Sequence, residues 1–69
     1  MYFKRLRDLR EDHDYTQAHV AAYLNMQRGV YQRYESGERE IPVWAVIKLA
    51  ELYGCTTDYI FGLTNQPHA

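Results

Sequence analysis

The sequence has little cysteine and no long apolar run, and these two features exclude disulfide-stabilised and membrane-spanning proteins. Its single cysteine, Cys55, cannot form an internal disulfide, so a reducing compartment is expected. No stretch approaches the roughly 20 apolar residues of a membrane-spanning helix. The N-terminal segment YFKRLR has no apolar signal-peptide core. We therefore expect a soluble, cytoplasmic protein.

The groupings of a metal site or an active site are also missing. The histidines do not have the spacing of metal ligands, even with Cys55 beside them: His13, His19 and His68. No Ser-His-acid arrangement or glycine-rich phosphate loop is present, and no pair of carboxylates is placed to share a cleft. We expect no metal, no cofactor and no enzymatic activity, and Cys55 is read as a buried thiol.

Charge of one sign does not dominate, because eight basic and nine acidic residues leave a net charge of −1. This total counts against a nucleic-acid-binding protein, but the distribution of charge matters more than the total. Basic residues crowd the N-terminal segment and recur in the middle of the chain: Lys4, Arg5, Arg7, Arg10, Arg28, Arg33 and Arg39. For Lys4, Arg5 and Arg7 a solvated face is favoured over a phosphate clamp. The sequence is therefore compatible with a basic binding face on a protein that is nearly neutral overall.

Apolar residues recur at helical spacing in short segments, and no segment alternates as a strand would. Helices are expected at 2–12, 17–24, 28–36, 43–53 and 57–61, with a flexible tail at 64–69. Thr16 is a good N-cap, and Asn25 tolerates the left-handed conformation that ends a helix. Sixty-nine residues make one domain, so we predict an all-α fold, a compact bundle of five short helices. One core is expected from Leu6, Leu9, Val20, Ala21, Leu24, Tyr31, Val46, Ile47 and Ala50.

Two of these helices, 17–24 and 28–36, are joined by a turn of about three residues, which is typical of a helix-turn-helix. In that motif the first helix braces the second, which projects its N-terminal side chains into the DNA major groove. Glutamine and arginine can each make two hydrogen bonds to a base edge. The projecting positions are Gln27, Arg28, Gly29, Gln32 and Arg33.

A long stretch of the chain resembles the Cro/C1-type helix-turn-helix family, also called the XRE family: YTQAHVAAYLNMQRGVYQRYESGEREIPVWAVIKLAELYGCTTDYIFG. Several independent segments match at the right spacing, from the Thr-Gln start of the second helix to Tyr-Glu-Ser-Gly and the final Asp-Tyr-Ile-Phe-Gly. The resemblance covers residues 3–63. It implies a lambda-repressor-like DNA-binding domain over 1–63 and a prokaryotic transcriptional regulator, in particular a repressor.

The resemblance also assigns roles by position. Base contacts fall to Gln27, Arg28 and Gln32, and contacts to the DNA backbone fall to Gln17, Arg33 and Arg39. It further implies a structural ion pair between Arg10 and Glu35. Two departures stand out: Asn25 replaces the usual glycine, and Gly29 lies where many relatives present a polar side chain, so one base contact is expected to be missing.

Several alternatives stay open at this stage. The acids Glu35, Glu38 and Glu40 could pair with Arg33 and Arg39 in place of DNA. Trp44 lies off the apolar stripe of its helix and is either an interface anchor or packed against the tail. One small module buries too little surface for high specificity, so a homodimer on a two-fold symmetric site is expected. The alternative function is a protein-interaction module on the same fold, such as an antitoxin or a partner-dependent subunit.

Overall fold

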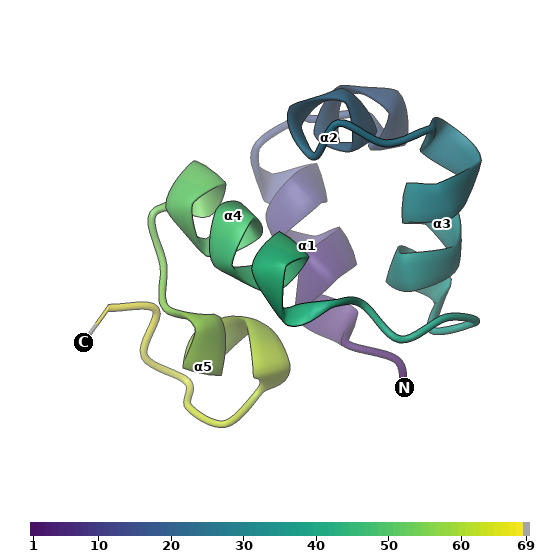
Figure 1. Ribbon diagram of the computed structural model, residues 1–69. Helices are drawn as coiled ribbons and strands as arrows, with labels where there is room; N and C mark the ends of the chain where they lie inside the picture. The colour runs from purple at the N-terminus through teal and green to yellow at the C-terminus, as the bar shows by residue number, and fades with distance from the viewer. Residues whose placement is uncertain (69) are drawn as a thin grey trace.

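The computed structural model describes residues 1–68, and within them five helices pack around a common core (Figure 1). In chain order they are α1 (Lys4–Asp12), α2 (Gln17–Tyr23), α3 (Arg28–Ser36), α4 (Val43–Tyr53) and α5 (Thr57–Phe61). Helices α2 and α3 contact each other, while α5 packs against both α1 and α4. Residues 1–68 contain no strand, so the predicted all-α fold is confirmed. The observed helix bounds differ from the predicted ones by at most two residues.

Local signals explain where the helices begin and end. The Thr16 hydroxyl accepts a hydrogen bond from the His19 amide at 3.0 Å, which satisfies one of the unpaired donors at the start of α2. The Thr56 hydroxyl does the same for the Tyr59 amide of α5, at 3.1 Å. Helix α3 ends at Gly37, whose φ of 83° is a left-handed conformation that a residue with a Cβ adopts at a cost.

The core is made of side chains from every helix, and those exposed by 8% or less are Leu6, Leu9, Val20, Ala21, Leu24, Tyr31, Ala45, Val46, Leu49, Ala50, Tyr53 and Ile60. The prediction for Ile47 was wrong, because this side chain is 47% exposed, and Val43, one helical turn before it, is 68% exposed. Helix α4 has apolar residues on two sides, so two different apolar stripes along it could face the core. Packing into the common core and against α5 buries the one through Ala45, Leu49 and Tyr53, which turns Ile47 outward.

The C-terminal segment folds back along the bundle and is held by Arg5. The guanidinium of Arg5 donates to the carbonyl oxygens of Tyr59, at 2.8 Å, and of Thr64, and to the Asn65 side chain at 2.6 Å. It also lies 4.0 Å from the centroid of the Tyr59 ring. The reading of Arg5 as a solvated residue was therefore wrong. The flexibility expected for residues 64–69 stays a prediction, and Ala69 lies outside the described residues. Free movement of this segment would require the Arg5 contacts to Thr64 and Asn65 to break.

Within residues 1–68, no helix is both long and apolar enough to cross a membrane.

Candidate nucleic-acid interface

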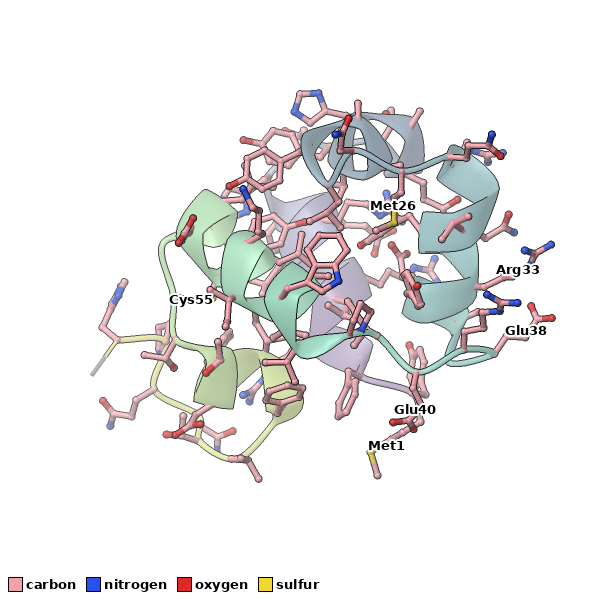
Figure 2. All side chains as sticks on the ribbon, in the orientation of Figure 1. Met1, Met26, Arg33, Glu38, Glu40 and Cys55 are labelled. Carbon is pink, nitrogen blue, oxygen red and sulfur yellow. The ribbon has the colours of Figure 1, made fainter. Side chains whose placement is uncertain are left out.

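The turn between α2 and α3 sets the direction of α3. Asn25 adopts the predicted left-handed conformation, with φ of 61°. The amides of Asn25 and Met26 donate to the carbonyl oxygens of Ala22 and Ala21, at 3.0 and 2.9 Å, and so close the end of α2. Gln27 is extended and precedes the first helical residue of α3. Met26 packs against the core between the two helices, so the turn is anchored from inside (Figure 2).

The three predicted base contacts form one exposed row that begins just before α3 and continues along it. Gln27, Arg28 and Gln32 are all exposed to solvent. The Gln27 side chain makes no hydrogen bond to the helix end that it precedes, so its amide remains available to a ligand. Gly29 is exposed beside them, and a Cβ added there would meet no protein atom within 4 Å. Nothing inside the described chain therefore requires glycine at this position.

The two arginines assigned to the DNA backbone lie at the far end of α3. Arg33 is in its last turn and points away from the bundle (Figure 2), and the Arg39 amide donates to the Arg33 carbonyl at 3.1 Å. This hydrogen bond holds the following loop against the helix. Among residues 1–68, no salt bridge involves Arg28, Arg33 or Arg39. The alternative in which nearby acids pair with Arg33 and Arg39 is not seen.

Glu35 is instead paired with Arg10 in the interior. Nε and Nη2 of Arg10 each donate to a carboxylate oxygen of Glu35 at 2.9 Å, and Nη1 donates to the Tyr15 carbonyl at 2.9 Å. The two side chains are 14% and 5% exposed. Burial alone would raise the pKa of Glu35, but Arg10, with smaller contributions from Tyr31 and Gln17, outweighs it and holds that pKa below its ordinary value. The structure thus brings these two predicted partners together and ties α1 to α3.

Gln17 lies at the first position of α2 and is partly buried. It faces an open hollow of about 280 Å³, which Gln32 of α3 and Arg7 of α1 also line. The sequence reasoning did not connect Arg7 with these two glutamines. The spacing of Arg7 and Arg10, three residues apart on one helix, could have shown that both side chains leave the same face of α1.

Within the described part of the chain, no three His, Cys, Asp or Glu side chains are grouped to hold a metal ion. Cys55 is partly buried between α4 and α5 (Figure 2), and burial raises the pKa of its thiol.

This architecture is that of a known class. A family model described as helix-turn-helix matches residues 6–60, most of the chain. The chain therefore belongs to the helix-turn-helix family, and the resemblance to its Cro/C1-type (XRE) members is confirmed. No solved structure gave a significant match to the chain.

Relatives of known sequence come from Bacillus subtilis, Vibrio cholerae and Pyrococcus species, among them two prophage or phage proteins. The uncharacterized HTH-type transcriptional regulator YobD of Bacillus subtilis is 37% identical over 67 residues, which covers 97% of this chain and 60% of YobD. The HTH-type transcriptional regulator ImmR of the same organism is 36% identical over 59 residues, 86% of this chain and 46% of ImmR. The cryptic phage CTXphi transcriptional repressor RstR, from Vibrio cholerae, is 35% identical over 54 residues, 78% of this chain and 49% of RstR. The chain thus spans only 46–60% of the length of these three relatives.

Proposed function

We propose that this chain is a sequence-specific DNA-binding transcriptional regulator that reads the major groove with α3. The observation that carries the proposal is the exposed row of Gln27, Arg28 and Gln32 on a helix whose position is fixed from inside. An α-helix with side chains fits the major groove, and these residue types can hydrogen-bond base edges in pairs.

The remaining predicted residues complete the interface. Gln17, Arg33 and Arg39 contact the DNA backbone, and such contacts set the register of the protein on the duplex without reading sequence. Arg33 and Arg39 suit this role because their charges are not neutralised within residues 1–68. Arg10 and Glu35 stay a structural pair. We propose a binding protein with no enzymatic activity and no cofactor.

Repression is the direction of regulation that we propose. RstR is named as a transcriptional repressor, and YobD and ImmR are named as transcriptional regulators. A DNA-binding domain can repress by occupying an operator that a polymerase would otherwise use. We place this action in the cytoplasm, on the nucleoid.

We further propose that the chain binds as a homodimer on a two-fold symmetric operator. A single small module buries too little DNA surface for high specificity, and two copies double it. The outer face of α4 supports this arrangement because Val43, Trp44 and Ile47 are 68%, 51% and 47% exposed. Exposed apolar side chains grouped on one helix are typical of a surface that a partner covers.

The experiment is selection of binding sites from random duplexes by the purified chain. We expect one enriched motif with inverted half-sites, their centres about 10–10.5 base pairs apart or a multiple of this, because both copies of α3 must meet one face of the duplex. The matched control is Arg28→Ala, which should lose preference at one position of each half-site. Enrichment of no motif, together with no binding to any duplex at low salt, would contradict the proposal.

A protein-interaction module is the second candidate. Glu38 and Glu40 flank Arg39 on the loop that follows α3, and both are exposed, which disfavours a close phosphate there. This candidate predicts that the chain alone shows no salt-dependent shift of any duplex.

A further inference from the structure

The hollow between α1 and α3 has no role in the interface described so far. It measures about 280 Å³, opens to solvent, and is lined by Arg7, Arg10, Gln17, Gln32 and Glu35. We infer that it seats one phosphate of the DNA backbone, and that Arg7 is the cation that holds this phosphate. The inference rests on the proposed function and adds a positioning residue on α1 to it.

Of the two arginines that line the hollow, Arg7 is the one whose charge is available to bind a phosphate. Arg10 also lines it, but three of its nitrogens already donate to Glu35 and to the Tyr15 carbonyl. Turning Arg10 toward a ligand would strand the carboxylate of Glu35, whose side chain is 5% exposed, and an unpaired buried charge is costly. The Arg10–Glu35 pair therefore contributes little net charge to the hollow.

Arg7 is held much more loosely. Its side chain is 60% exposed, and its Nε lies 3.4 Å from the carboxylate of Glu11, one helical turn away. Exposed pairs at this spacing contribute little to stability, because solvent screens the two charges. A phosphate can displace such a pair, since an arginine fork binds two phosphate oxygens at once.

The position of the hollow fits the path of a DNA strand. Gln17 lines it from the start of α2 and Gln32 from the middle of α3. In the proposed complex Gln17 contacts a phosphate and Gln32 contacts a base. A strand that satisfies both glutamines passes over the mouth of the hollow, so the adjoining phosphate comes within reach of Arg7.

The test compares Arg7→Gln with Lys4→Gln on the same helix. Lys4 is a matched control because it is also exposed, also pairs with an acid four residues on (Asp8, 3.8 Å), and does not line this hollow. Affinity is measured for the selected duplex and a scrambled duplex between 50 and 200 mM salt. Thermal unfolding of each variant checks that the fold is retained.

We expect Arg7→Gln to weaken binding to both duplexes by the same factor, because a phosphate carries no sequence information. The slope of log affinity against log salt should become shallower by about one unit, so that raising salt from 50 to 200 mM costs about 3.5-fold less affinity than in the unmodified chain. Lys4→Gln should change the slope by less than half of this. Arg7→Lys should restore most of the slope, because it keeps the charge.

Two outcomes would overturn the inference while the proposed function stands. The first is that the unmodified chain binds DNA and that Arg7→Gln has the same slope of log affinity against log salt as the unmodified chain. The other is an equal change of slope in Lys4→Gln, which would reflect total charge and no phosphate seat. Failure of the unmodified chain to bind any duplex would overturn the proposed function itself and this inference with it.

Discussion

The Arg10 guanidinium and the Glu35 carboxylate meet side by side, through two hydrogen bonds of 2.9 Å each. They join α1 to α3 across 25 residues of sequence. A third hydrogen bond from Arg10, to the Tyr15 carbonyl, adds the segment that leads into α2. One partly buried arginine therefore ties α3 to α1 and to the segment that leads into α2.

A double-mutant cycle should reveal this coupling. Arg10→Met and Glu35→Gln should each lower the free energy of unfolding strongly, by up to about 3–5 kcal/mol, because each strands a buried partner. The double variant should lose much less than the sum of the two. Urea unfolding measures all four proteins, and the exposed pair Lys4–Asp8 is the control, with an expected coupling below about 1 kcal/mol. Additive losses for Arg10 and Glu35 would contradict the coupling.

Stability should fall in acid through Glu35. Its pKa is lower in the folded chain than its ordinary value of 4.5, so its contribution to stability is complete above that value and is lost as pH falls through the folded pKa. The difference in unfolding free energy between the unmodified chain and Glu35→Gln should therefore be constant near neutral pH and shrink below about pH 4.5. Urea unfolding across pH 3–7 measures it. If the difference in unfolding free energy became larger in acid, the pKa of Glu35 would not be lowered by folding.

Gly37 should resist substitution more than other glycines. It combines φ of 83° with close contact, since an added Cβ would lie 2.9 Å from both Cα and Cβ of Tyr2. Gly62 has nearly the same φ, 80°, with no atom within 4 Å of an added Cβ. Gly62→Ala should cost about 1–2 kcal/mol for the left-handed backbone alone, and Gly37→Ala clearly more. Equal shifts in thermal unfolding would mean that the Tyr2 contact is not tight.

Removing the Tyr53 hydroxyl should not destabilise the chain. This side chain is 8% exposed and its hydroxyl has no hydrogen-bond partner within residues 1–68. Burial also raises the pKa of Tyr53, which keeps the phenol protonated. We expect Tyr53→Phe to leave the unfolding free energy unchanged or to raise it by about 1 kcal/mol, because a buried unpaired hydroxyl is costly. A loss above about 1 kcal/mol would show that the hydroxyl is hydrogen-bonded in solution.

Arg28 and Arg39 should separate reading from positioning. Arg28→Ala should cost about 1–3 kcal/mol on the selected duplex and little on a scrambled one, if its guanidinium pairs with a guanine edge. Arg39→Ala should weaken both duplexes alike and flatten the salt dependence by about one unit. Binding measured at several salt concentrations gives both quantities. Equal losses on both duplexes for Arg28→Ala would remove it from the reading role.

Most of the helix boundaries could be predicted because their causes are local. Thr16 caps a helix through an amide three residues away, and Asn25 ends one by its own backbone conformation. Such signals act within one turn of helix, so they can be read without knowing the rest of the fold. The exposed row on α3 was likewise predicted by spacing, together with the family resemblance.

Local spacing could not decide which side of an apolar helix is buried. In α4, Ile47 and Leu49 are both strongly apolar, and only packing into the core and against α5 distinguishes them, leaving Ile47 exposed and Leu49 fully buried. Arg5 gave no sign that it would bind the carbonyls of Tyr59 and Thr64, because its partners are more than 50 residues away.

The sequence by itself thus determined five helices, their ends and the polar row on α3, because propensity, capping and periodicity depend on neighbours within a few residues. The tertiary structure alone decided the exposed face of α4, the anchoring by Arg5, and the hollow that places Arg7 beside Gln17 and Gln32. These features arise from side chains distant in sequence that share one small volume. Which of them meet depends on how all the helices pack at once.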